Sequence, residues 1–295
     1  MSLSREQVEA LAEHLGKTKR QLQRYKPIEP SQAVVTEYAR EIGALANQIM
    51  KRVKGEVLPI LEKIVSSRKS SLAKDEDLNA SLKNAFDVIE QSFAQQQKGL
   101  DDYAARTATK AFTAQNRFHR RAWVKELNKL AGIDVRKIVN ESAVEAALPA
   151  RIEENIKLIK TVKPEYLEQV KKEVYSGLSR GDDFFSIKKR LGEVETYHTK
   201  YRPRLIARDQ MNKLTGALNQ IRQEDVGIRE YTWRTSHDER VRPSHRANNG
   251  RVFSWSKPPA TGHPGEDIQC RCVAEPKFDK WLRSLSQKKS WKPKK

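Results

Sequence analysis

The sequence predicts a mainly α protein, in which an elongated helical N-terminal region precedes a small α+β C-terminal module with a short antiparallel sheet. Before residue 229, apolar residues recur every three or four positions, which is the spacing of one buried helix face. From 229 to 235, large aromatic residues alternate with polar ones, as in a strand with one buried face. We divide the chain into an N-terminal arm, a helical region, the C-terminal module and a basic tail, at residues 1–30, 31–200, 201–276 and 277–295.

The composition favours elongated helices, or surfaces that partners cover, over one compact globule. Apolar residues make up 37% of the 295 positions and charged residues 32%, an apolar share below the usual one. The net charge of +19 attracts phosphates, acidic protein surfaces or anionic membranes, and nucleic acid is the first partner we expect. The sequence has neither an initial hydrophobic segment nor a long apolar run, so we expect no signal peptide, no spanning helix and synthesis in a cytosol. Two cysteines are too few for a disulfide scaffold of the secreted type.

The first long helix is expected to start after Ser31. Two prolines, Pro27 and Pro30, end the amphipathic segment that precedes it. A serine hydroxyl can accept a hydrogen bond from the first helical turn, so Ser31 is a suitable cap. The apolar positions then continue until Gly55 and Pro59, which we expect to interrupt the helix. A seam of this kind requires a partner helix.

Further helices are predicted by the same spacing. They cover residues 78–93, 101–130, 142–162, 164–178 and 184–191. Pro164 suits the first turn of its helix, where the missing N–H has no intrahelical partner in any case. We expect Gly181 to end that helix and Gly192 to end the next one.

The C-terminal module begins with a helix that contains Leu205 to Leu214 and ends near Gly227. In the strand that follows, Tyr231 and Trp233 are expected to point inward. Residues 237–245 form a turn or one short helix, Asn248-Asn249-Gly250 forms a turn, and 251–255 forms a second strand. Residues 257–266 form a loop by composition. Cys270 and Cys272 are then placed on one side of a last short strand.

Four side chains of the module make a candidate zinc site, namely His245, His263, Cys270 and Cys272, because imidazole and thiolate are the usual ligands of structural zinc. A second interpretation, in which these side chains bind no metal, remains open. The thiols can pack as small apolar groups, and the histidines can bind backbone or carboxylates to hold loops. We expect no cofactor on this second interpretation. Carboxylates at 238, 266 and 267 are also expected to pair with Arg240 and Arg242.

A metal-dependent nuclease is the enzymatic alternative, because several residues supply a possible base and metal ligands beside many arginines: His237, Asp238, His245, Asn249 and His263. Their spacing follows no recognised nuclease pattern. The sequence also contains no phosphate-binding glycine loop, nucleophile elbow or zinc-protease helix. We therefore expect a protein that is not an enzyme.

Several motifs of the module occur in a linked order. Arg208-Asp209-Gln210 with Asn212 comes first, and the later motifs contain Trp233, Asp238, Arg240, Arg242, His245, Gly250, His263, Pro264, Cys270 and Cys272. In this order and spacing, the module resembles the phage Mu protein F-like family, the minor head proteins also called phage head morphogenesis proteins. The resemblance covers about a quarter of the chain and leaves the helical region to be interpreted from its own residues.

The resemblance implies a structural minor head protein of a tailed phage, inside the head near the portal vertex of the virion and in the host cytoplasm during assembly. Its implied partners are the portal protein and the major head or scaffolding protein, with no membrane. The helical region is the candidate portal-binding part. Non-specific contact with double-stranded DNA during packaging or ejection would suit the positive charge, and the tail offers Lys288, Lys289, Lys292, Lys294 and Lys295. An independent DNA-binding protein of the host is a further alternative.

Overall fold

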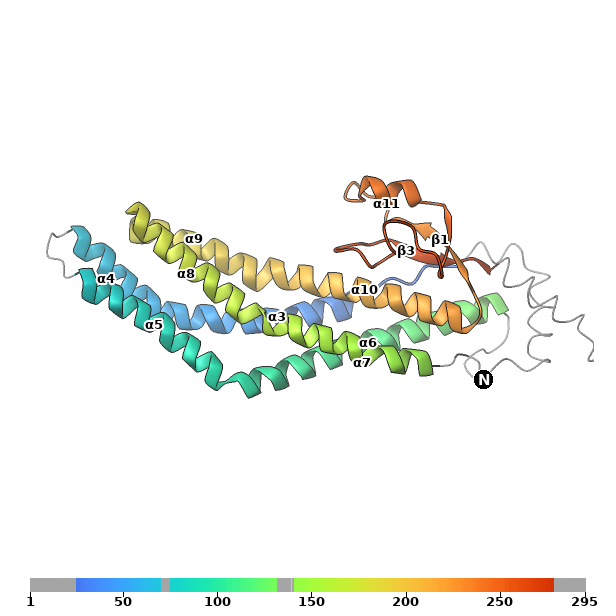
Figure 1. Ribbon diagram of the computed structural model, residues 1–295, viewed down its shortest axis with the longest axis horizontal. Coiled ribbons are helices and arrows are strands. Elements are labelled where there is room, and N and C mark those ends of the chain that lie inside the picture. Colours follow the sequence, from blue (N-terminus) through green and yellow to red (C-terminus); the bar gives the residue numbers. More distant parts are fainter. Residues whose placement is uncertain (1–24, 70–74, 132–138, 140, 279–295) are drawn as a thin grey trace, which may run out of the picture. The chain divides into compact units, whose positions relative to one another are not determined.

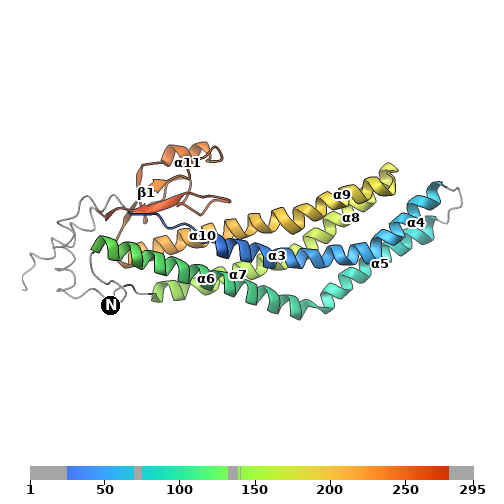
Figure 2. The same ribbon diagram turned by 180° about the vertical axis from the view of Figure 1, so that it is seen from behind.

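A computed structural model describes residues 25–69, 75–131, 139 and 141–278. The predicted arm up to residue 24 and the five tail lysines lie outside the described residues. Within them, long helices precede a small three-stranded antiparallel sheet along the chain, as Figures 1 and 2 show. The predicted fold class is confirmed. No helix of the described part is long and apolar enough to cross a membrane.

The elements are named as in Figure 1. The helical part consists of α3 (Gln32–Arg52), η1 (Val53–Val57), α4 (Leu58–Lys69), α5 (Asp75–Gln95), α6 (Gln97–Ala131), α7 (Ser142–Lys160), α8 (Val162–Arg180), α9 (Phe184–Thr196), η2 (Tyr197–Tyr201) and α10 (Arg202–Asp225). The module adds β1 (Glu230–Arg234), α11 (Pro243–Asn248), β2 (Val252–Ser254) and β3 (Val273–Pro276). The helices predicted from apolar spacing are thus present, and Gly181 ends α8 in a left-handed conformation with φ 73°.

Two predicted helix breaks are wrong. The chain runs from α3 through the π-helical turn η1 into α4, although Gly55 and Pro59 lie there. A proline ring in a regular α-helix would clash with the carbonyl four residues earlier, and for Pro59 that carbonyl lies in the wider π turn, which changes the geometry. In the same way α9 continues through Gly192 into η2, which ends at Tyr201, two residues before Pro203 in α10. Both prolines are therefore accommodated without ending the helix.

The described chain divides into two compact units, and one of them contains residues Val35–Ala111 and Ile152–Ala207. In this unit α4 packs against α5, and α8 packs against α9. The predicted seam of α3 is buried at Tyr38, Ile42, Leu45 and Ile49. The carbonyl oxygen of Thr199, in η2, approaches Gly43 so closely that a Cβ there would lie 2.8 Å from it. A glycine is therefore required at this helix contact.

The described parts of Met1–Val34, Phe112–Arg151 and Arg208–Lys295 form the other unit. Here buried polar side chains join α6 and α10. Gln115 donates to the Thr215 hydroxyl at 3.0 Å, and His119 Nε2 lies 2.9 Å from Asn219 Oδ1. Buried polar groups need such partners, so these pairs fix which residues of the two helices face each other.

The sheet has the order β2-β1-β3, and both pairings are antiparallel. Tyr231 and Trp233 on β1 are fully buried, as predicted, and pack with Trp255 and the two cysteines. The placement of the cysteines on the last strand is wrong, because β3 begins one residue after Cys272. Val273 pairs with Arg234, the last residue of β1, so the ladder has no partner for the cysteines.

Candidate metal centre

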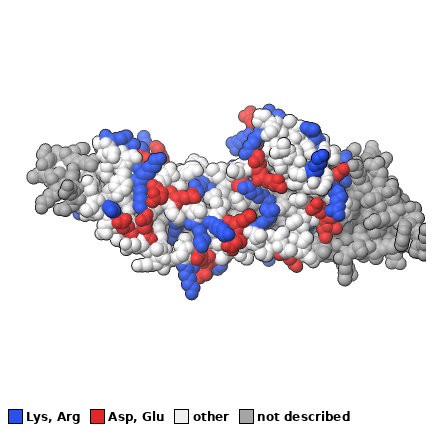
Figure 3. Space-filling view, viewed as in Figure 1, with Lys and Arg blue, Asp and Glu red and all other residues white. Residues whose placement is uncertain are grey.

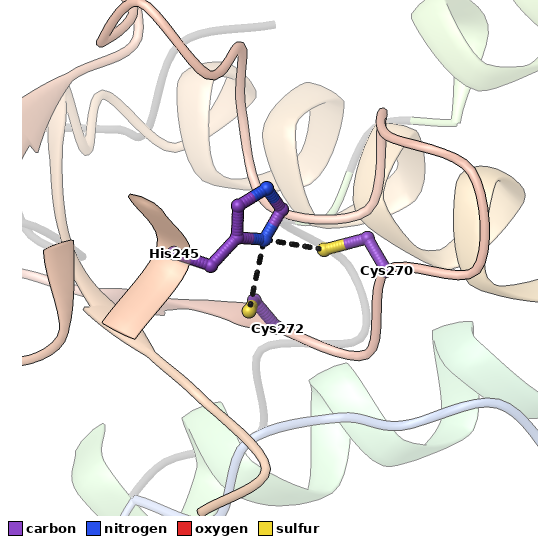
Figure 4. Close-up of side chains that lie close together, drawn as sticks. All are labelled: His245, Cys270 and Cys272. Atoms are coloured by element: carbon purple, nitrogen blue, oxygen red, sulfur yellow. Dashed lines mark hydrogen bonds between the residues drawn. The ribbon is translucent and has the colours of Figure 1, made fainter. Parts of the chain in front are cut away.

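His245, Cys270 and Cys272 converge in the interior of the module (Figure 4). His245 lies in the short helix α11, whose first residue, Pro243, suits a helix start. The two cysteines belong to the segment that leads into β3. The His245 ring meets Trp233 edge to face, with centroids 5.3 Å apart, and this contact fixes where the imidazole lies.

The three donor atoms form a compact cluster. Nδ1 of His245 lies 3.5 Å from Sγ of Cys270 and 3.6 Å from Sγ of Cys272. All three donor atoms lie within 4.8 Å of one another. The side chains are buried, with 2%, 3% and 7% of their residues' surface exposed for His245, Cys270 and Cys272. The cluster is thus shielded from solvent, and its donors are those that soft divalent metals prefer.

A carboxylate orients the imidazole from the other side. Nε2 of His245 lies 3.0 Å from Oδ2 of Asp267. A carboxylate only accepts hydrogen bonds, so Nε2 carries a hydrogen and donates it. In the neutral ring the lone pair of Nδ1 then faces the two sulfurs, the tautomer that a metal ligand needs.

The pKa values of the two cysteine thiols are shifted in opposite directions. A hydrogen bond from the Cys272 thiol lowers the pKa of Cys270 to about 6 and outweighs the effect of burial. The backbone N–H of Gly265 also donates to Cys270 Sγ, at 3.4 Å. The same thiol–thiolate bond, together with burial, raises the pKa of Cys272. The two thiols therefore titrate as a pair, with Cys270 losing its proton first.

His263, the fourth predicted ligand, lies outside this cluster. Its Nδ1 lies 2.9 Å from the Tyr231 hydroxyl, and its ring packs on Trp255 with centroids 4.9 Å apart. Its backbone N–H donates to the Glu266 carboxylate at 2.6 Å. Three of the four predicted zinc ligands are therefore brought together, and His263 instead holds its loop against the aromatic core.

The remaining motif residues hold loops. Arg242 donates to the Ile268 carbonyl at 2.6 Å and lies 3.4 Å from the Asp267 carboxylate, as predicted for this pair. Asp238 was expected to pair with Arg240 and Arg242, but its side-chain ion pair is with Arg271. Because Arg271 stands between the two cysteines, this ion pair also positions the segment that carries them.

Two side chains of helix α10 hold the turn that precedes Cys270. Arg208 donates to the Gln269 side-chain oxygen at 2.8 and 2.5 Å, and the Asp209 carboxylate accepts from the Gln269 backbone N–H at 2.5 Å. Gln269 has a positive φ of 57°, an unfavourable conformation that these contacts hold in place. Residues of the Arg208-Asp209-Gln210 motif thus shape the turn before Cys270.

The five residues of the nuclease alternative have separate partners or positions. His237 is exposed, Asp238 pairs with Arg271, and Asn249 Oδ1 accepts from the Thr235 backbone N–H at 3.0 Å. Among the described residues, the cluster of metal-binding side chains contains His245 but none of the other four. The geometry gives the nuclease alternative no support.

The C-terminal part of the chain is similar to one protein family. Residues 168–275 match the family model described as Phage Mu protein F like protein. These residues thus resemble the Mu F-like family. The Mu F-like region therefore runs from α8 through the sheet and contains the candidate metal centre. It confirms the resemblance predicted from the C-terminal motifs, and the match begins before residue 201.

A protein of Haemophilus influenzae, described as an uncharacterized protein, is 40% identical to the chain over 158 residues. The aligned part is 52% of this chain and 34% of the relative, so the chain spans about a third of that protein's length. No solved structure matches the chain.

Proposed function

We propose that the chain is a minor head protein of a tailed phage, a structural component that binds the portal vertex during head assembly. The match of residues 168–275 to the Mu F-like family carries this proposal. It supports a place in the virion and partners among the other head proteins. The portal protein and the major head or scaffolding protein are the partners we propose.

Exposed apolar side chains support a partner surface in the Mu F-like region. Among the described residues, seven of the eight large hydrophobic side chains that are exposed lie between 168 and 275. Five of them belong to α8, α9, η2 and α10, namely Tyr175, Phe185, Tyr197, Tyr201 and Leu205. Aromatic residues are enriched at protein interfaces. We call these five residues the aromatic surface.

The positive charge supports contact with DNA, chiefly through the C-terminal tail. On the face drawn in Figure 3, Lys and Arg side chains are interspersed with Asp and Glu, and many ion pairs neutralise them locally. Residues 277–295, in contrast, contain eight Lys and Arg and one Asp. We propose that this tail, with Lys288, Lys289, Lys292, Lys294 and Lys295, contacts the DNA backbone without reading sequence.

The head role is tested in purified phage particles of a host in which the gene is active. We expect mass spectrometry to find the chain in mature heads and a reconstruction to place it against the portal. A pull-down with the portal protein from the same phage should show that the purified chain binds it. Particles that assemble, package DNA and contain none of this chain would contradict the proposal.

The DNA contact is tested by measuring affinity for double-stranded DNA across a salt series. Each phosphate contact contributes a slope of about −0.9 in a plot of log affinity against log salt. Removal of residues 279–295 should lower the affinity and flatten the slope. A slope that is the same with and without the tail would show that the contact lies elsewhere.

A further inference from the structure

We propose that the Mu F-like region contains a structural zinc site whose protein ligands are Nδ1 of His245 and the sulfurs of Cys270 and Cys272. This inference is independent of the proposed role in the head. It rests on the convergence of three buried donor atoms and on the groups that orient them.

The direction of the donors favours a shared ion over simple packing. Packing of the thiols as small apolar groups would need only their volume, and it would not require an imidazole nitrogen close to both sulfurs. Instead Nδ1 lies 3.5 and 3.6 Å from the two sulfurs, nearly equidistant from both. An ion at the centre would draw these atoms together, because zinc–sulfur and zinc–nitrogen bonds are about 2.3 and 2.0 Å long.

The surrounding groups are those that a thiolate–imidazole zinc site requires. Asp267 accepts from Nε2 of His245 at 3.0 Å, which is the usual carboxylate partner of a metal-binding histidine. The Gly265 N–H donates to Cys270 Sγ at 3.4 Å and would offset the charge of a bound thiolate.

Coordination and burial together decide the kind of site. One nitrogen and two sulfurs favour zinc among the common divalent ions, because magnesium and calcium prefer oxygen. Among the described residues, the cluster contains three such side chains, so a fourth ligand of a tetrahedral zinc would come from outside this set. The burial of all three donors favours a structural role for the ion.

The ion would connect segments that the sheet does not join. His245 is in α11, whereas Cys270 and Cys272 precede β3 and lie beyond the end of the strand ladder. The backbone hydrogen bonds between residues 258 and 272 are local turns, such as Gly262 N–H to Pro259 and Cys270 N–H to Asp267, so side-chain contacts and packing join this part of the loop to α11. Zinc would fix this loop to α11, and its removal should loosen the module.

Metal content of the full chain, purified under reducing conditions without chelator, is the first test. We expect one zinc per chain by elemental analysis. After exchange for cobalt, we expect thiolate-to-cobalt charge-transfer absorption in the near ultraviolet. A chain that binds neither zinc nor cobalt stoichiometrically would overturn the proposal.

Variants separate the proposed ligands from their neighbours. Cys270→Ser and Cys272→Ser should each abolish stoichiometric binding, whereas His263→Gln should retain it, because His263 pairs with Tyr231. Loss of metal in a folded His263→Gln variant would overturn the three-ligand assignment.

Because Asp267 is partly exposed, its substitution should test zinc binding without unfolding the chain. Asp267→Asn should weaken zinc affinity about 10- to 100-fold, as measured by competition with a chelator. Glu239→Gln removes an exposed carboxylate outside the cluster and should leave zinc affinity unchanged. Equal affinities in the two variants would contradict the role of Asp267. Finding two thiols fewer by alkylation, with no metal, would identify a Cys270–Cys272 disulfide instead and overturn the proposal.

Discussion

Arg222, on α10, donates a hydrogen bond to Nδ1 of His119, on α6, at 2.7 Å, and both side chains are buried. Because Nδ1 accepts this bond, the ring carries its hydrogen on Nε2 and donates it to Asn219. The guanidinium also donates to Glu141 and Asn116, both at 2.6 Å. A neutral histidine thus lies between a buried cation and the polar face that joins the two helices.

Replacing Arg222 with methionine should destabilise the unit that contains α6 and α10. The substitution keeps most of the volume but leaves Glu141 with only the more distant Arg120, 3.4 Å away. Loss of one partner of a buried ion pair costs about 3 kcal/mol or more. Urea denaturation followed by circular dichroism measures the change. Arg117→Met, which removes an exposed arginine of α6, should leave the midpoint nearly unchanged.

The stability of the fold should decrease as the pH is lowered through the range in which His119 is neutral in the folded state but protonated in the unfolded state. Burial, and then the charge of Arg222, lower the pKa of His119 from 6.5 to about 3 in the folded chain. Between these values the unfolded state binds the extra proton, so the neutral ring stabilises the fold above pH 6.5 and this contribution is lost toward pH 3.

His119→Gln isolates this effect, because glutamine can accept from Arg222 and donate to Asn219 but does not titrate. Wild type should lose up to about 1.4 kcal/mol per pH unit more than the variant between pH 6 and 4. Denaturant midpoints at several pH values give the two slopes. Parallel slopes would show that His119 already binds its proton in the folded chain.

Gly216→Ala should destabilise the module, because the loop backbone lies against α10 at this point. A Cβ at Gly216 would lie 2.6 Å from the Pro264 carbonyl oxygen, and backbone atoms cannot move aside cheaply. We expect a loss of about 1–3 kcal/mol, typical of overpacking. Gly192→Ala is the matched control, since a Cβ there would have no atom within 4 Å. Helix propensity predicts that this control is stabilised by about 0.5–1 kcal/mol, so a loss in both would contradict the contact argument.

The sequence predicts the elements that follow from one regular pattern. The alternation at Tyr231 and Trp233 identifies β1 and its buried face, and the apolar spacing identifies the helices. The polar pairing of α6 with α10 could not be predicted in this way. Gln115 and His119, four residues apart, have the pattern of a solvated face, and they are buried only because Thr215 and Asn219 face them.

The sequence predicts which types of residue form the candidate metal centre, but it does not predict which of these residues come together. His245 and His263 are equally suitable ligands in the sequence, and the path of the loop alone separates them. The contribution of Asp267 also depends on that path, because it reaches His245 from 22 positions away. A glycine inside a helix, as at Gly216, is a signal of close backbone approach that could have indicated where the loop packs.

Phe185→Ser should weaken the binding of a head-protein partner without destabilising the chain. The Phe185 side chain is 77% exposed at the start of α9, so its removal takes away little buried area. If the aromatic surface binds the portal protein, loss of the Phe185 ring should weaken that binding about tenfold or more. A pull-down with purified portal protein measures this, and thermal unfolding checks the fold. Val88→Ser removes an exposed apolar residue of α5 outside the Mu F-like region, and it should leave binding intact. Equal binding by both variants would show that the partner uses another face.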